Sequence, residues 1–448
     1  MRATLVLAAM ALAAGCAYID PHNMIGRQLS ATPTTDELSA GVTSPLTVAE
    51  REKAFDFVWN TINERYHDPA LNGTDWAAAA RKYRPLALAA PNDEAFWDVL
   101  DRMTGELHDA HTRVESPSRV ALRRRDESIT LGFSFARVEG KLAVTGVNGE
   151  SDAWWSGVRP GMLLISIAGE PAEIAYAKLE SETRYDSTER SRQQRAVRRL
   201  MTGELGSQVA FTFERSDGTR FDTVLSRRKV TNRPSETHRL LPSGFGYVRF
   251  SQWTLSLSAR ASESIAEMKN APGLVIDLRN NPGGAITAVN RMLGHFFSER
   301  TELGRATTRT GRPISLFFDA VEIIKLKTIV EGSADAYKGP VVILVNAGSA
   351  SGSELFAGTM QAVGRAKVVG TPSCGCLLGF LGYAPIPGGG ELAYSEVGFI
   401  MTNGKHIEGE GVVPDHTVFP TLKDLQQNRD RTLEEAQEIL RTLAPAAR

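Results

Sequence analysis

Large apolar residues recur at helical spacing in the first third of the chain. They comprise Phe55, Val58, Trp59, Ile62 and Tyr66, then, after a Pro/Asn/Gly break, Trp76, Tyr83, Phe96, Trp97, Leu100 and Met103. Apolar residues three or four positions apart lie on one face of a helix. The pattern predicts a helical subdomain over residues 47–117, with these aromatic side chains in its core.

The pattern changes to short strand-like runs over residues 127–230. Apolar residues alternate with polar ones or form brief runs between glycine turns, which is typical of β-strands. The runs are Ile129–Phe135, Lys141–Thr145, part of Gly157–Gly169, Val209–Phe213 and Asp222–Leu225. A β-rich domain is predicted here.

Strands and helices alternate over residues 235–425. Gly273–Leu278, Val341–Val345 and Ala366–Gly370 are continuous apolar runs of the kind found in strands buried on both faces. Helical segments follow Phe250 and begin near Ser351. This alternation predicts an α/β layer. Residues 426–448 are predicted to contain a final helix.

The N-terminus has the pattern of an export signal. Arg2 precedes an apolar stretch from Leu5 to Ala14 that is too short to span a bilayer. Residues 1–15 are therefore predicted to be a signal peptide. Leu12-Ala-Ala-Gly-Cys16 resembles a bacterial lipobox, which implies cleavage before Cys16 and lipid on its thiol. The alternative is an ordinary signal peptide. Residues 16–46 then form a flexible tether.

Lipidation at Cys16 implies an exported bacterial lipoprotein anchored in a membrane. Ala17, and not Asp, follows the cysteine. In a host with two membranes, we therefore expect the protein at the periplasmic face of the outer membrane.

Charge and cysteine content exclude several other classes. The formal net charge is -1 at pH 7, so no overall attraction to nucleic acid is expected. The basic run Arg123–Arg125 is interpreted as a solvated loop. Besides Cys16, only Cys374 and Cys376 occur, either bridged or as free thiols. Neither a metal nor an organic cofactor is expected.

A serine-rich turn follows one of the buried strands. Asn346-Ala-Gly-Ser-Ala-Ser351-Gly-Ser-Glu leads from the strand into a helix. A strand-to-helix corner exposes a side chain above the sheet edge and directs free N–H groups toward it. This geometry suits a nucleophile, although a serine N-cap alone has the same pattern.

A second motif also leaves a buried strand, at Asp277-Leu-Arg-Asn-Asn-Pro-Gly-Gly284. Adjacent glycines allow backbone donors to approach a substrate carbonyl closely. Together with Ser351-Gly-Ser-Glu and Ser156-Gly-Val-Arg-Pro-Gly-Met-Leu-Leu164, this motif resembles the carboxyl-terminal-processing protease family over residues 48–420. The resemblance implies a ClpP/crotonase-like α/β core over residues 235–425 and a PDZ-like domain over residues 127–230.

The resemblance also implies roles for individual residues. Ser351 would be the nucleophile, with Ser349 and Ser353 as competitors. The oxyanion donors would be the N–H groups of Gly352 and of either Gly283 or Gly284. The PDZ-like carboxylate-binding loop would comprise Leu131, Gly132, Phe133 and Ser134.

The residue at the position of the catalytic base differs from that of the Ser–Lys members of this family. Its Ser–Lys members carry a lysine where this chain has Cys376 and a glutamine where it has Phe380. Leu107-His-Asp-Ala-His111-Thr resembles instead a motif of the tricorn-core branch, which uses Ser, His and Glu. This implies that His111 is the base, with His108 a solvent-facing residue. Glu408 would orient His111, and Glu410 is the alternative; Asp109 is too close in sequence to be assumed the partner.

These features predict a serine endopeptidase that cleaves peptide or protein substrates, which the PDZ-like domain would bind through their C-termini. The alternative is a catalytically inactive peptide-binding homologue of the same fold. Hydrolysis of a non-protein ester or amide is a third hypothesis, because acyl chemistry alone does not fix the substrate.

Overall fold

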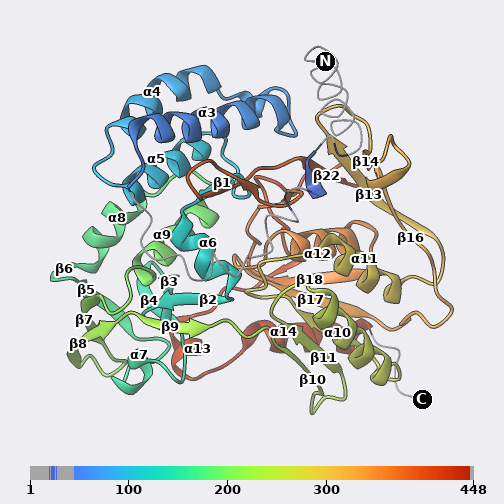
Figure 1. Cartoon of the computed structure of the whole chain (residues 1–448). Helices are drawn as coiled ribbons and strands as arrows, with labels where there is room; N and C mark the ends of the chain where they lie inside the picture. Colours follow the sequence, from blue (N-terminus) through green and yellow to red (C-terminus); the bar gives the residue numbers. More distant parts are fainter. Residues whose placement is uncertain (1–19, 21, 26, 28–44, 444–448) are drawn as a thin grey trace. The chain divides into compact units, whose positions relative to one another are not determined.

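The computed structural model describes residues 20, 22–25, 27 and 45–443 (Figure 1). The predicted signal peptide and Cys16 lie outside the described residues. The chain divides into two compact units. Unit 1 comprises Met1–Arg124, Glu302–Ile329 and Leu378–His406; unit 2 comprises Arg125–Thr301, Val330–Leu377 and Ile407–Arg448.

Unit 1 contains the helices that the apolar pattern predicts. They are α3 (Val48–Arg65), α4 (Trp76–Leu88) and α5 (Asp93–Gly105), with a 3-10 turn at Leu71–Gly73. Thr47 and Glu50 form a capping box that fixes the start of α3. The predicted aromatic residues are buried together, apart from the partly buried Trp59. Helix α6 (Pro117–Arg124) follows.

Two small sheets complete unit 1. One has the order β1-β21-β20, formed by Arg113–Glu115, Glu391–Ala393 and Ala384–Pro385. The other has the order β16-β13-β22-β19, formed by Lys327–Val330, Thr301–Thr308, Val397–Met401 and Leu378–Gly379. A hairpin pairs β14 (Ile314–Leu316) with β15 (Val321–Ile324).

The basic run in this unit is not the solvated loop expected from the sequence. Arg123 and Arg124 lie in the last turn of α6. Arg123 Nε is 2.6 Å from Glu115 Oε2, and Arg124 Nη2 is 2.6 Å from Glu391 Oε1. Because the Glu391 side chain is only 6% exposed, these arginines compensate a buried charge. The interpretation as a solvated loop was wrong for Arg123 and Arg124.

Unit 2 begins with a β-rich domain. Its sheet has the order β3-β4-β5-β7-β8, formed by Phe133–Val138, Lys141–Val147, Leu163–Ile167, Gln208–Glu214 and Arg220–Ser226. The short strand β6 (Glu170–Pro171) pairs with β5, and β2 (Glu127–Thr130) pairs with β9 (Arg228–Thr231). The predicted single strand Ile129–Phe135 was wrong, because the chain turns at Gly132, where φ is +82°.

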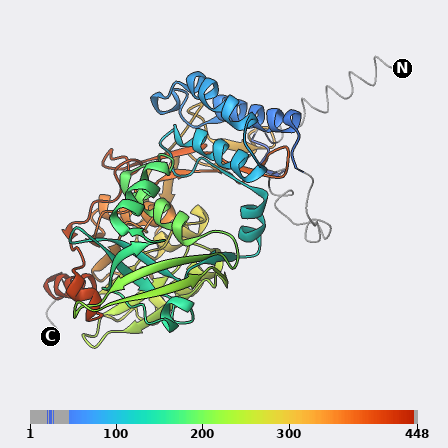
Figure 2. The same ribbon diagram turned by 90° about the vertical axis from the view of Figure 1, so that its left-hand side faces the viewer.

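Helices not predicted from the sequence cover this sheet (Figure 2). They are α8 (Ala172–Glu182) and α9 (Glu189–Met201), and a short helix α7 (Asp152–Trp155) precedes them. Tyr176 of α8 and Ala196 of α9 pack in one core with Phe211 and Phe213.

The rest of unit 2 is built on a six-stranded sheet. Its order is β10-β11-β12-β17-β18-β23, formed by Glu236–Leu240, Gly246–Phe250, Leu274–Asp277, Val341–Val345, Ala366–Gly370 and His416–Thr417. All neighbouring strands are parallel except β10 and β11. The carboxyl ends of parallel strands share one edge, which is where ligands bind in open α/β sheets.

Helices cover both faces of this sheet (Figure 1). On one side lie α10 (Leu255–Glu267), α11 (Ile286–Leu293) and α12 (Gly352–Ala362), with a 3-10 turn at Gly294–Phe296. On the other, α14 (Arg431–Leu443) packs Leu440 against Val342 and Leu344. A short helix, α13 (Leu422–Gln426), precedes it. The predicted mixed α/β, multi-domain fold is confirmed.

Candidate active site

Ser351 occupies the corner between β17 and α12. It is the N-cap residue of α12, with φ 53° and ψ −116°. A positive φ is rare for a residue other than glycine, and such conformations occur at functional sites where the surrounding structure holds them. A serine on a sharp strand-to-helix turn matches the geometry of a nucleophile elbow.

The two competing serines are buried and bonded to the backbone. Ser349 Oγ donates to Leu278 O at 2.7 Å, and Ser353 Oγ donates to Asn281 O at 2.9 Å. Both side chains are 0% exposed, whereas Ser351 is partly exposed. Ser349 and Ser353 therefore tie the Ser351 corner to the turn after β12, while Ser351 itself stays partly exposed.

The glycine turn after β12 packs directly against this corner. A Cβ atom on Gly283 would lie 2.6 Å from Ser351 Cβ and 2.7 Å from Gly352 N, so only glycine fits. The Gly283 N–H donates to Asn281 Oδ1 at 3.0 Å. A Cβ atom on Gly352 would lie 3.3 Å from Gly284 N. The Gly352 and Gly284 amides thus lie at the same corner, and the Gly283 amide is engaged elsewhere.

Cys376, which stands where Ser–Lys enzymes carry their lysine, forms a disulfide with Cys374. The sequence had left this pairing open. The bonded pair is buried, with Cys374 7% and Cys376 2% exposed. Cys376 O accepts the N–H of Ser351 at 3.0 Å. Its sulfur atom is engaged in a covalent bond and is not available as a base.

Glu354, in the first turn of α12, lies beneath the same corner. Its fully buried carboxylate accepts hydrogen bonds from Ser373 Oγ and from the N–H groups of Ser351, Gly375 and Cys376. Burial disfavours the charged form and raises the pKa of Glu354 to about 7, although these four donors act in the opposite direction.

Glu408 lies on the segment between β22 and β23. It is partly buried, and its Oε2 accepts the N–H of Leu377 at 2.5 Å. Glu410 is exposed, and its backbone carbonyl accepts a hydrogen bond from Arg190 at 2.6 Å. Of the two predicted carboxylates, Glu408 is thus the one joined to the segment that follows the disulfide.

His111 lies in unit 1, just before β1. Its side chain is 9% exposed, and its N–H donates to Asp109 Oδ1 at 2.7 Å. Asp109 is 0% exposed and also accepts hydrogen bonds from Thr112 Oγ1 and Ser395 Oγ. Asp109 therefore fixes the turn that carries His111. His108, by contrast, is exposed, as expected from the sequence.

Aromatic and basic side chains surround the His111 turn within unit 1. The Phe380 ring lies 6.2 Å from the His111 ring, measured between centroids. The Arg113 guanidinium lies 5.4 Å from the centre of the Phe380 ring and donates to His111 O at 3.2 Å. Phe380, at the glutamine position of the Ser–Lys enzymes, is thus an apolar neighbour of the predicted base.

The predicted site residues fall into two groups. Ser351, Glu408 and the three glycines belong to unit 2, where hydrogen bonds join Ser351 and Glu408 to the same disulfide segment. His111 belongs to unit 1, together with Asp109 and Phe380.

Sequence reasoning missed the roles of Glu354 and Asp109. Both had a local signal. Ser351 and Glu354 have capping-box spacing, and Asp109 precedes His111 by the two residues of an Asx turn.

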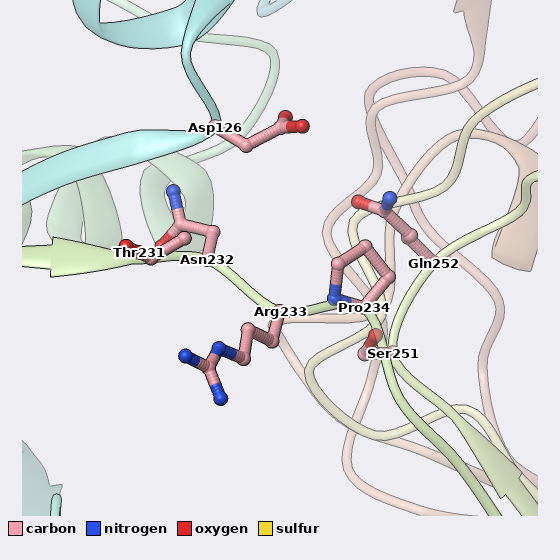
Figure 3. Close-up of a pocket in the computed structure, with 7 residues that line it drawn as sticks. All are labelled: Asp126, Thr231, Asn232, Arg233, Pro234, Ser251 and Gln252. Carbon is pink, nitrogen blue, oxygen red and sulfur yellow. The ribbon is translucent and has the colours of Figure 1, made fainter.

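Figure 3 shows an open pocket that does not contain a predicted site residue. Its volume is about 360 Å³, and Asp126 and Gln252 extend toward each other across it, whereas Arg233 points away. It is polar and lies within unit 2. Ser251 and Gln252, which line the pocket, come directly before Trp253 in the sequence. The backbone N–H of Trp253 donates to Gly283 O at 2.9 Å.

Within the described ranges, no helix has both the length and the apolar character needed to cross a membrane. Across the same part of the chain, no cluster of three or more His, Cys, Asp or Glu side chains is arranged to hold a metal ion.

Comparison with known proteins finds two family models that match separate parts of the chain. Residues 244–418, which include Ser351, match the model of peptidase family S41. Residues 47–105, the helical segment of unit 1, match the model of the tricorn protease C1 domain. The resemblance inferred from the motifs is confirmed, and these matches support a serine peptidase, a hydrolase of peptide bonds.

Individual relatives come from both branches. Tricorn protease homolog 2 of Streptomyces coelicolor is 24% identical over 89% of this chain, which spans 33% of that protein's length. The chloroplastic C-terminal processing peptidase of Tetradesmus obliquus is 27% identical, over 84% of this chain and 79% of the relative. The solved structure of a photosystem II D1 C-terminal processing protease has the same fold, with a TM-score of 0.54 and 23% identity, over 91% of this chain and 99% of that one.

Proposed function

We propose that the chain hydrolyses peptide or protein substrates through an acyl-enzyme on Ser351, with His111 as general base and Glu408 as the carboxylate that orients it. The observation that carries the proposal is the backbone of Ser351, a non-glycine residue at positive φ that is partly exposed between two buried, bonded serines. The relatives named as processing proteases support a protein substrate.

In the proposed reaction, Ser351 Oγ attacks the scissile carbonyl carbon while His111 accepts the hydroxyl proton. The N–H groups of Gly352 and Gly284 stabilise the oxyanion, because the Gly283 N–H already donates to Asn281. When the C–N bond breaks, His111 returns the proton to the leaving amine. Water then attacks the acyl-enzyme with His111 again as base, and Ser351 is regenerated.

The β-rich domain is proposed to be PDZ-like and to bind extended peptides with free C-termini. The supporting observation is that β3 lies at one end of its sheet, so a peptide strand can pair with its outer edge. The loop Leu131–Ser134 leads directly into β3, and α9 packs beside this strand. The six-stranded layer of unit 2 is likewise proposed to be a ClpP/crotonase-like core.

Export and anchoring at Cys16 form part of the proposal. The Cys374–Cys376 disulfide supports export, because such bonds persist mainly in oxidising compartments. The proposed location is the periplasmic face of the outer membrane in a host with two membranes.

A fluorophosphonate probe tests the nucleophile. We expect the wild-type protein to be labelled, Ser351→Ala to lose the label, and Ser256→Ala, at an exposed position in α10, to keep it. Thermal unfolding of each variant checks that it is folded. A wild-type protein that takes no label would favour the inactive, peptide-binding homologue.

A further inference from the structure

The disulfide segment Ser373–Leu377 connects the two proposed catalytic groups of unit 2. On one side, Cys376 O accepts the N–H of Ser351 at 3.0 Å. On the other, the N–H of Leu377 donates to Glu408 Oε2 at 2.5 Å. The single peptide group that joins Cys376 to Leu377 therefore contacts both the nucleophile's backbone and the orienting carboxylate.

Hydrogen bonds to the Glu354 carboxylate also hold this segment in place. Glu354 accepts the N–H groups of Gly375 and Cys376 at 2.7 and 2.9 Å, and Ser373 Oγ donates to the same carboxylate at 2.5 Å. The bonds from Gly375 and Cys376 require the Cys374–Cys376 turn to present its amides to one carboxylate. A disulfide across this turn restricts the conformations that would turn those amides away.

Backbone bonds hold the segment that carries Glu408 to the same turn. The N–H of Gly409 donates to Gly375 O at 2.9 Å, and the N–H of Val412 donates to Ser373 Oγ at 2.7 Å. Gly375 has a φ of +76°, and a Cβ atom there would lie 3.1 Å from Gly411 N. The turn and the Glu408 segment therefore pack too closely to move independently.

We propose that the Cys374–Cys376 disulfide is a positioning element, which sets the backbone of Ser351 and the carboxylate of Glu408 in one geometry. This inference rests on the proposed function. The disulfide takes the place at which the Ser–Lys enzymes carry their base, but it acts through the backbone and not as an acid or base. It forms when the two thiols transfer two electrons and two protons to a disulfide oxidant, which is reduced to its dithiol.

The direct test is the double variant Cys374→Ser/Cys376→Ser, compared with wild type in peptide hydrolysis and in the rate of fluorophosphonate labelling. We expect kcat and the labelling rate to fall about 10- to 100-fold, because small displacements of a catalytic group cost about this much. KM should change far less, since the segment orients reacting groups. When wild type is alkylated without prior reduction, mass spectrometry should find Cys374 and Cys376 unalkylated, because their thiols are bonded to each other.

A phosphine reductant supplies the matched comparison. Reduced wild type should fall to the rate of the double variant and recover on reoxidation, while the double variant itself should not respond. Two free thiols in active wild-type protein, or equal kcat values for wild type and double variant, would overturn the proposal.

The same experiment distinguishes a failure of the proposed function from a failure of the positioning role alone. In that case wild type would take no label at all, and the positioning role would be overturned with it. Hydrogen exchange at the amides of Ser351 and Leu377 separates this outcome from a merely structural disulfide. Faster exchange in the double variant together with an unchanged labelling rate would assign the bond to folding alone.

Discussion

At the scale of single residues, buried carboxylates shape the segments that carry the proposed catalytic side chains. Asp109 binds the backbone of His111, and Glu354 binds the backbone of Ser351. Neither is proposed to touch a substrate. Each instead satisfies amide and hydroxyl donors that would otherwise be buried without a partner, which is costly.

The first prediction concerns the base. His111→Ala should lower kcat by about 100-fold or more, because general base assistance is lost. His108→Ala is the matched control and should retain activity, since its side chain is exposed three residues away. Glu408→Gln should cost less than His111→Ala, because orientation is lost but the base remains. Steady-state hydrolysis of one peptide measures all three; an active His111→Ala enzyme would rule out this base.

The second prediction concerns Glu354. Its folded-state pKa of about 7 lies above the usual range because of burial, so its neutral form is favoured in the folded state. The corresponding stability is present below the unfolded-state pKa and is lost as pH rises through 7. Between pH 4 and 8 the free energy of unfolding of wild type should therefore fall relative to Glu354→Gln, by roughly 3 kcal/mol.

Denaturant unfolding of both proteins across this pH range measures the difference. Other titrating groups are common to the two proteins and cancel in the comparison. Parallel curves for wild type and Glu354→Gln would mean that the Glu354 carboxyl does not titrate with folding in this range.

Much of the unit 2 site could be predicted at this scale, because Ser351 and Gly283 belong to local motifs next to buried strands. The disulfide and the three bonds from its segment to Glu354 could not. They depend on a turn about twenty residues further along the chain, whose approach to α12 is set by the sheet. For the same reason, the sequence left the pairing of Cys374 with Cys376 open, and the positioning role proposed for their bond follows only from the structure.

At the scale of elements, the parallel strands were easiest to predict. β12, β17 and β18 are buried on both faces, so their apolar runs are continuous. Helix α9 was missed because its sequence, Glu-Arg-Ser-Arg-Gln-Gln-Arg, carries few apolar residues and buries only Ser191, Ala196 and Met201. Strands β13, β15 and β16 were missed because they are only partly buried and lack a clear alternation. Strand β14 is buried but only three residues long, which is too short for a pattern.

The third prediction belongs to the turn before β3. A Cβ atom on Gly132 would lie 2.2 Å from Ser151 Cβ, so Gly132→Ala should displace the proposed carboxylate-binding loop. Gly140→Ala is the matched control, because Gly140 has a similar φ of +79° but nothing within 4 Å of its Cβ position. In both variants the positive φ costs roughly 1 to 2 kcal/mol of stability. Only in Gly132→Ala does the added Cβ atom also clash with a neighbouring residue, Ser151.

Binding of a peptide with an apolar free C-terminus provides the measurement. Wild type and Gly140→Ala should bind it and should bind its C-terminal amide more weakly, because the carboxylate charge is removed. Gly132→Ala should lose the preference for the acid. Equal affinity of wild type for acid and amide would show that the domain recognises something other than a C-terminus.

At the scale of the whole molecule, unit 1 combines three separate stretches of sequence. A pattern taken along the chain cannot reveal this, because the pairing of β1 with β21 joins residues almost 280 positions apart (Arg113 with Ala393). The described part of the N-terminal segment also belongs to this unit. Arg27 is 3% exposed and donates to Glu396 at 2.7 Å, while His22 lies 3.1 Å from the same carboxylate.

The contact between Arg27 and Glu396 limits how far this part of unit 1 can lie from the proposed lipid anchor at Cys16. Burial opposes ionisation of Glu396, but the hydrogen bonds from His22 and Arg27 and the Arg27 charge outweigh it, so its pKa lies below the usual value. Arg27 lies eleven positions after Cys16. At about 3.5 Å per extended residue, the lipid would hold this point of unit 1 within roughly 40 Å of the membrane.

The last prediction is that this anchor exists. Metabolic labelling with a fatty-acid probe should mark wild type and Cys374→Ser/Cys376→Ser, and it should not mark Cys16→Ala, because only Cys16 follows the lipobox-like segment. Cys16→Ala protein should also leave the membrane fraction, since no helix among the described residues could replace the lipid. Label that persists in Cys16→Ala would place the lipid elsewhere, and wild-type protein without label would favour an ordinary signal peptide.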